Sequence, residues 1–283
     1  MSNNHPIDSH NATSGGKMSE ARYLDDHYEA TKVDYEQMLR SVGIEKGWNV
    51  LDAGGGGGSY LRLLTELVGD SGTVMITDLA SENVQHVAAR IDRGEFRCRV
   101  ETRTANVVEL PFPDDAFDAV WCAAVTQYLS DDEVVTAFNE FKRVVRPGGL
   151  VAIKEGDITA WHFGPFPSAV IWRSFIEYMD RPERGFMRAP KFAAMFRAAG
   201  LENIVSRTTL IEKYQPLSPV ERRFIREAFK YMSSLNLKLD LSDDDKEWWL
   251  ALSNVDDPQH ILNDEDFFYR EPHNVTVGRV PTT

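Results

Sequence analysis

Apolar positions recur along the chain in two patterns that predict strands and helices in alternation. Residues 19–42 carry apolar side chains at three- and four-residue steps, which indicates a helix that ends at Gly43. Short apolar runs then predict five strands, at residues 50–51, 73–77, 100–104, 117–122 and 150–154. Helical spacing separates most of these runs, at residues 60–68, 82–93 and 133–145. Such alternation is typical of right-handed βαβ units, so we expect an α/β fold on a parallel sheet.

The regular alternation ends at Glu155. Residues 157–178 are rich in Trp, Phe and Pro, and the later elements are less evenly spaced. The pattern predicts helices at 190–199, 218–234 and around 248–249, and strands at 204–211 and 267–280. No linker marks a second domain. We therefore expect a disordered N-terminal tail at residues 1–18, followed by one domain at residues 19–283.

The composition narrows the class of protein. The chain of 283 residues carries 31 Lys and Arg against 44 Asp and Glu, which gives a net charge of −13. This acidic balance argues against a nucleic-acid partner, which needs a basic surface. A hydrophobic content of 42% excludes wholesale disorder, and no apolar run approaches the ~20 residues that span a bilayer. We expect a cytoplasmic protein with no membrane partner, and the sequence leaves open whether it forms a homo-oligomer.

Cysteine and histidine positions do not indicate a metal site. Cys98 and Cys122 are the only cysteines, so there is neither a disulfide framework nor a CxxC cluster. The seven histidines lack HxxxH or HxH spacing, and residues 243–245 lack the spacing of a calcium loop. We therefore expect a reducing compartment and no metal.

The most informative stretch is a run of five glycines between the first predicted strand and the helix that follows it. Glycines at this position let a ligand approach the backbone closely. The dinucleotide pattern GxGxxG fails, because its last glycine falls on Ser59, Tyr60 or Leu61. The P-loop pattern fails because no Lys-Ser/Thr pair follows the glycines. The stretch fits DxGxGxG, formed by Asp52, Gly54, Gly56 and Gly58.

This pattern resembles motif I of the class I S-adenosylmethionine-dependent methyltransferases. Asp78 ends the second predicted strand, where this family has an acidic residue. Three further stretches resemble the family's later motifs in order: residues 105–112 (ANVVELPF), 113–120 (PDDAFDAV) and 143–149 (RVVRPGG). The resemblance covers a cofactor-binding core at residues 48–155.

The resemblance implies a more specific fold than the pattern alone. It implies a Rossmann-like, seven-stranded, mostly parallel sheet with helices on both faces and an antiparallel last strand. Helical lid insertions on the substrate side would occupy about residues 156–190 and 215–263. These segments lie where members of the family differ for specificity.

The implied cofactor is S-adenosyl-L-methionine, with S-adenosyl-L-homocysteine as the product. This ligand carries a sulfonium and an ammonium group but no phosphate, which suits the acidic Asp52. Asp78 is implied to accept the ribose hydroxyls, although on its own it also suits a helix cap. Asn106 replaces the family's usual Asp, and its amide oxygen can still accept a hydrogen bond from adenine. The implied cofactor-binding residues are Asp52, Gly54, Gly56, Gly58, Asp78, Leu79, Asn106, Val107, Cys122, Ala123 and Tyr23.

Ligands of open α/β sheets bind at the carboxyl ends of the strands, so we expect the substrate after strands four and five. The candidate substrate-binding residues are Gln127, Tyr128, Trp161, Phe163, Trp172 and Tyr178. Packing of the aromatic residues against the sheet is the alternative interpretation. A basic stretch at residues 181–197 is interpreted as a solvated face, with recognition of an anionic substrate group as the alternative.

Methylation of a hydroxyl or of a carbon releases a proton, so the same region should hold a proton acceptor. His162 is the first candidate, because an ordinary histidine pKa of ~6.5 suits a general base near neutral pH. Asp157 and Glu155 are the alternatives. A buried structural histidine is the competing interpretation of His162.

The sequence therefore predicts in-line methyl transfer from S-adenosylmethionine to a small, partly apolar molecule, in a biosynthetic role. One alternative is a protein of the same fold that uses the cofactor pocket for binding or cyclisation without methyl transfer. A dehydrogenase is a second alternative, and the failed GxGxxG pattern argues against it.

Overall fold

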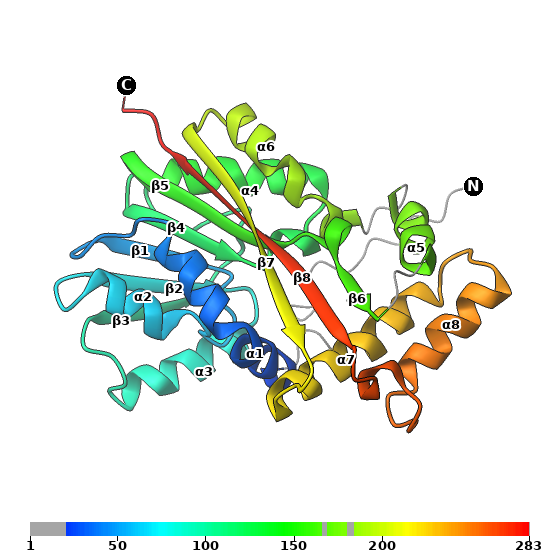
Figure 1. The fold of residues 1–283 in the computed structure, drawn as a ribbon. Coiled ribbons are helices and arrows are strands. Elements are labelled where there is room, and N and C mark those ends of the chain that lie inside the picture. Colours follow the sequence, from blue (N-terminus) through cyan, green and yellow to red (C-terminus); the bar gives the residue numbers. More distant parts are fainter. Residues whose placement is uncertain (1–20, 166–168, 180–183, 283) are drawn as a thin grey trace.

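A computed structural model of the chain describes residues 21–165, 169–179 and 184–282. Within these residues eight strands form one sheet in the order β3-β2-β1-β4-β5-β8-β6, with β7 also paired to β8 (Figure 1). The strands are β1 (Asn49–Ala53), β2 (Thr73–Asp78), β3 (Arg99–Thr104), β4 (Phe117–Ala123), β5 (Val145–Gly156), β6 (His162–Gly164), β7 (Glu202–Tyr214) and β8 (Phe268–Arg279).

The helices surround this sheet. The α-helices are α1 (Ala21–Arg40), α2 (Leu61–Val68), α3 (Ser81–Asp92), α4 (Asp131–Val144), α5 (Ala169–Met179), α6 (Phe192–Ala198), α7 (Pro219–Asn236) and α8 (Asp243–Ser253). Short 3-10 turns are η2 (Thr126–Tyr128), η3 (Ile158–Ala160), η4 (Arg184–Met187), η5 (Ala189–Lys191) and η6 (Ile261–Asn263). No helix in the described ranges has the length and apolarity needed to cross a bilayer.

Strands β1 to β5 run parallel, as the βαβ pattern predicts. Their registers place paired apolar residues on the same face of the sheet, for example Leu51 beside Val120, while the preceding Val50 faces the other side. Local signals define the helices between them. At α4, for instance, Ser130 and Glu133 form a capping box, with Ser130 Oγ accepting from the Glu133 amide and Glu133 from the Ser130 amide.

Strand β8 is the antiparallel member of the sheet. Residues 273–279 of β8 pair with β5, and residues 268–270 pair with β6. Strand β7 pairs along the other edge of β8. The α/β fold with an antiparallel last strand is confirmed, and the sheet has one strand more than the seven predicted. The added strand is the three-residue β6, which is too short to leave a periodic pattern in the sequence.

Three apolar clusters hold the layers together. Helices α1 and α2 pack on one face of the sheet, and α4 and α6 pack on the other (Figure 1). Helices α5, α7 and α8 form a third cluster with β6 and the start of β8. Figure 1 shows this cluster beyond the carboxyl ends of the parallel strands, where ligands of such sheets bind.

Candidate functional site

The glycine run forms a tight loop between β1 and α2. The amides of Gly54 and Gly55 donate to the carbonyl oxygen of Thr77, at 2.8 and 2.9 Å. Gly54 has a φ of 74°, a conformation that disfavours any side chain. A Cβ at Gly55 would lie 2.6 Å from Asp52 Oδ2, so the loop also has no room for a side chain there. Glycine is thus required by both conformation and space.

Asp78 lies at the end of β2 and holds this loop. Its Oδ2 accepts from the amide of Gly56 at 2.9 Å. Its Oδ1 accepts from the amide of Ala80 and from Asn83 Nδ2, at 2.9 and 3.0 Å. Asp78 therefore joins the loop to the start of α3, and its Oδ2, which accepts one hydrogen bond, retains acceptor capacity for a ligand.

Asp52 is buried at the carboxyl end of β1, directly before the loop. Its Oδ2 has no hydrogen-bond partner among the described residues. Burial, together with the charge of Asp78, raises the pKa of Asp52 to about 7. A buried carboxyl group in this state is stabilised as an anion when a cationic ligand lies next to it.

Tyr60 is a candidate site residue that the sequence reasoning missed. It lies two residues after the last glycine of the loop, directly before α2. Its hydroxyl is buried without a hydrogen-bond partner in the described part of the chain. Its ring packs edge-on against Trp121 and Tyr28, with ring centres 5.3 and 5.4 Å apart. Burial raises the pKa of Tyr60, so the hydroxyl stays protonated and can donate. Its place at the end of the motif was the only available sequence signal.

The predicted adenine side of the site is more exposed. Asn106 Oδ1 accepts from the amide of Val108 at 3.2 Å, and the side chain faces solvent. Val107 is buried in the apolar cluster under α4, and Leu79 is exposed beside Asp78. The Asn106 side chain thus stabilises the turn at residues 106–108 and remains accessible to a ligand.

The candidate residues at the end of β4 and just after it differ in burial. Cys122 is fully buried in the α4-side cluster, and burial raises the pKa of its thiol. Ala123 is half-buried, and Ala124 has a positive φ of 58°. Of the next two candidates, Gln127 is half-buried and its Nε2 donates to the Ala124 carbonyl oxygen, while Tyr128 is 47% exposed.

Two of the three candidate catalytic residues, Glu155 and Asp157, hold neighbouring backbone through hydrogen bonds. Glu155 is buried, and its Oε1 accepts from the amide and the hydroxyl of Thr126, at 2.6 and 2.8 Å. Burial raises the pKa of Glu155. Asp157 is the N-cap residue of η3, and its Oδ1 accepts a hydrogen bond from the amide of Thr159. Both carboxyl groups therefore fix the loops that follow β4 and β5.

His162 lies in β6 on the face of the sheet that carries Phe268 and Arg270. Its ring centre is 5.4 Å from that of Phe268. Burial and the charge of Arg270 lower the pKa of His162 below its usual value. The imidazole is therefore neutral near pH 7 and able to accept a proton.

The aromatic residues predicted to bind substrate differ in burial. Trp161 and Phe163 are buried in the cluster formed by α5, α7 and α8, while Tyr178 packs against it. Trp172 is 60% exposed on α5. The side chain of Tyr23, in α1, lies outside what the structure describes.

In the basic stretch at residues 181–197, Arg188 supports the backbone of a neighbouring loop. Arg188 is buried and donates to the carbonyl oxygens of Thr126 and Leu129, at 2.7 and 2.9 Å. It also pairs with Asp131 at the start of α4. This guanidinium group supports the loop after β4. Arg181 lies outside the described residues.

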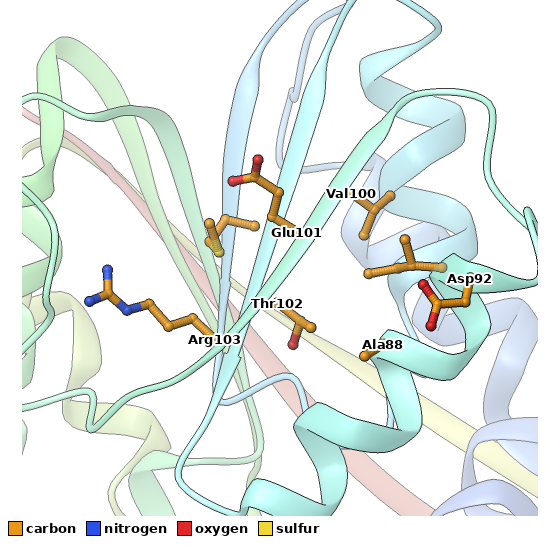
Figure 2. A pocket seen from close by; sticks show the side chains of 8 residues that line it. Ala88, Asp92, Val100, Glu101, Thr102 and Arg103 are labelled. Atoms are coloured by element: carbon orange, nitrogen blue, oxygen red, sulfur yellow. The ribbon is translucent and has the colours of Figure 1, made fainter.

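A separate groove lies at the outer edge of β3 (Figure 2). Its wall combines α3 with the exposed strand, and Asp92, Glu101 and Arg103 line it. None of the residues that line it belongs to the glycine loop or to the predicted substrate side. The groove is therefore distinct from the candidate cofactor site.

The residues around the glycine loop fit S-adenosylmethionine. The loop lets the ligand approach the backbone, and Asp52 offers a cationic ligand a carboxyl oxygen that has no partner in the described part of the chain. Tyr60 offers a second buried polar atom. The one guanidinium that touches the loop belongs, within the described residues, to Arg90, which donates to the carbonyl oxygens of Gly57 and Gly58.

Comparison with known proteins agrees with this geometry. Residues 50–149 match a family described as "Methyltransferase domain". The chain is 34% identical over 140 residues to ubiquinone/menaquinone biosynthesis C-methyltransferase UbiE of Hahella chejuensis, covering 44% of this chain and 55% of the relative. It is 29% identical over 184 residues to demethylmenaquinone methyltransferase of Bacillus subtilis, covering 60% and 77%. The chain thus spans about half the length of the first relative.

Solved structures show the same fold. Phosphoethanolamine N-methyltransferase 2 of Haemonchus contortus, in complex with S-adenosyl-L-methionine, superposes with a TM-score of 0.55 at 17% identity, covering 93% of this chain and 59% of that one. The [4+2]-cyclase SpnF superposes with a TM-score of 0.54 at 20% identity, covering 90% and 83%. At these identities the likeness concerns the fold alone.

The resemblance of the motifs is therefore confirmed. Residues 50–149 match a methyltransferase domain, and the residues around its glycine loop fit S-adenosylmethionine as a ligand.

Proposed function

We propose that this protein transfers a methyl group from S-adenosylmethionine to a small, partly apolar molecule. The observation that carries the proposal is the buried carboxyl oxygen of Asp52 beside the glycine loop, which has no hydrogen-bond partner among the residues that the structure describes. It provides a place for a cationic ligand directly at the carboxyl end of β1. The names of the two quinone-pathway relatives support an apolar acceptor.

When bound, the cofactor supplies a methyl group that is already activated by its sulfonium. The chain then has to bind, align and keep water away from the reacting groups. We propose that Asp78 and the glycine loop position the cofactor, and that the aromatic cluster of α5, α7 and α8 provides an apolar boundary on the acceptor side.

Saturating S-adenosylmethionine or S-adenosylhomocysteine should stabilise the protein against unfolding. A ligand that binds only the folded state stabilises it by about 2.7 kcal/mol when its concentration is 100 times Kd. Thermal unfolding with each adenosyl ligand, and with NAD as the control, tests this. A shift with NAD and none with the adenosyl ligands would contradict the proposal.

Methyl transfer itself needs a separate test, because a cyclase of this fold also exists. Cofactor with an isotopically labelled methyl group should label a quinol or phenol acceptor. Cofactor binding without label transfer to any acceptor, together with a skeletal rearrangement of the acceptor, would favour the cyclisation alternative.

We propose His162 as the proton acceptor if the acceptor atom must lose a proton. General-base catalysis typically contributes 10²–10⁴-fold to a rate. Replacing His162 by Gln should therefore lower the single-turnover rate on this scale while cofactor affinity stays nearly unchanged. A loss of less than about threefold would remove His162 from the reaction and favour proton release to solvent.

A further inference from the structure

Four side chains from α1 and β8 meet at one point. His27 Nε2 lies 3.0 Å from Glu271 Oε1 and 2.9 Å from the hydroxyl of Tyr35. His273 Nε2 lies 2.6 Å from the same Glu271 oxygen and 3.0 Å from the same hydroxyl. Two nitrogens and two oxygens therefore alternate around a closed ring of four contacts, which we call the His-Glu-Tyr ring.

Local structure explains this convergence. Residues 271 and 273 are two apart on β8, so their side chains project from the same face of the sheet. Residues 27 and 35 are eight apart on α1, which is about two helical turns at 3.6 residues per turn, so their side chains lie on the same face of the helix. The ring of His27 stacks on Phe224 of α7 with an interplanar angle of 3°, which fixes its orientation.

Ordinary hydrogen bonding does not satisfy the His-Glu-Tyr ring. An imidazole nitrogen carries either one proton or one lone pair in the ring plane. Each Nε2 here faces two oxygens, so neither nitrogen can make a linear hydrogen bond to both. A positive centre between the four atoms would instead accept one lone pair from each.

The spacing also suits a metal ion. Ligand bonds of ~2.1 Å at right angles to each other place neighbouring ligand atoms ~3.0 Å apart. Three of the four contacts are between 2.9 and 3.0 Å, and the fourth is 2.6 Å. The potential ligand atoms of His27, Glu271 and His273 all lie within 4.8 Å of one another. Two imidazoles and one carboxylate form the set that binds divalent transition metals with open positions.

We propose that His27, Glu271 and His273, with the Tyr35 hydroxyl, bind one divalent transition-metal ion. The side chains of His27 and Glu271 are 17% and 13% exposed, which leaves an approach from outside. Lys154 is the cation that faces this region from β5, and its Nζ lies over the Tyr35 ring, 3.4 Å from the ring centre. Its charge opposes the ion, so replacing Lys154 by Met is expected to tighten binding.

The position of the ion gives it a role in the fold. His273 pairs with Gly156 at the carboxyl end of β5, and His27 belongs to the N-terminal helix. The ion would therefore fasten α1 to the end of the sheet where the acceptor is proposed to bind. Binding of the ion should accordingly stabilise the folded protein.

The test uses full-length protein without an affinity tag, stripped of metals by a chelator. Zn²⁺ is titrated by calorimetry, and Co²⁺ is titrated as a spectroscopic probe of the ligand set. We expect one ion per chain, a rise in Tm with Zn²⁺ and visible Co²⁺ absorption bands. His27→Ala and Glu271→Gln should each weaken Zn²⁺ binding at least about tenfold.

His162→Ala is the matched control, because it removes a half-buried histidine outside the ring, and it should leave Zn²⁺ affinity unchanged. Tyr35→Phe keeps the packing and should change the Co²⁺ spectrum. Circular dichroism establishes that each variant is folded. Absence of a stoichiometric ion in the native chain would overturn the proposal, and so would equal Zn²⁺ affinity in native, His27→Ala and Glu271→Gln protein.

Discussion

Replacing Asp52 by Asn should stabilise the cofactor-free protein at neutral and alkaline pH and weaken its binding of S-adenosylmethionine. Asp52 is buried, its Oδ2 has no partner among the described residues, and burial raises its pKa to about 7. The unfolded chain has an ordinary Asp pKa of ~3.9. Asn has almost the same shape and no charge, so the substitution removes the titration while keeping the packing.

The sign of the pH effect follows from this difference in pKa. Between pH ~4 and pH 7 the unfolded chain releases the Asp52 proton and the folded chain keeps it, so stability falls as pH rises. At roughly 1.4 kcal/mol for each of about three pKa units, the loss reaches at most about 4 kcal/mol. Above pH 7 both states are ionised, and the loss becomes constant.

Denaturant unfolding of both proteins at several pH values checks this expectation. The stability of Asp52→Asn relative to the native protein should rise from pH 4 to pH 7 and then level off. Cofactor affinity should rise with pH in the native protein, because the ionised carboxylate attracts the cationic ligand, and should stay flat in the variant. A stability difference that is independent of pH would show that Asp52 is ionised in the folded protein throughout.

The cofactor side of the molecule could be predicted because its signal is local. The strand, the glycines and the acidic residue occupy one continuous stretch, and Asp78 follows at the end of the next strand. Parallel pairing of β1 with β2 then brings these segments together without further information. The motif order also defined the α/β fold, apart from the short β6.

The substrate side could not be predicted in the same way, because its contacts join distant segments. Glu155 is bound to Thr126 across two strands, and sequence spacing gave no sign of this pairing. The His-Glu-Tyr ring joins His27 to His273, which are far apart in the chain, so a search for short histidine spacings does not find it. Whether Trp161 is buried or exposed depended on α7 and α8 packing against it.

Replacing Asp78 by Ala should weaken cofactor affinity by at least about tenfold. A charge-assisted hydrogen bond contributes roughly 1.5–3 kcal/mol, and Asp78 Oδ2 is proposed to accept such a bond from the ribose. Asn106→Ala should weaken binding less, because a neutral amide makes a weaker bond and Asn106 Oδ1 already accepts from Val108. Calorimetric titration with S-adenosylhomocysteine gives the two affinities.

Asp78 also binds the amide of Gly56, so part of the loss could come from a displaced loop rather than from the ribose. A ribose-deficient probe separates the two causes. If Asp78 acts on the ribose, Asp78→Ala should weaken S-adenosylhomocysteine far more than an analogue without the ribose hydroxyls. Asp78→Asn, which keeps one acceptor oxygen, should lie between the native protein and Asp78→Ala. Equal losses for both ligands would assign Asp78 to loop support alone, and a larger loss in Asn106→Ala than in Asp78→Ala would contradict the placement of ribose and adenine.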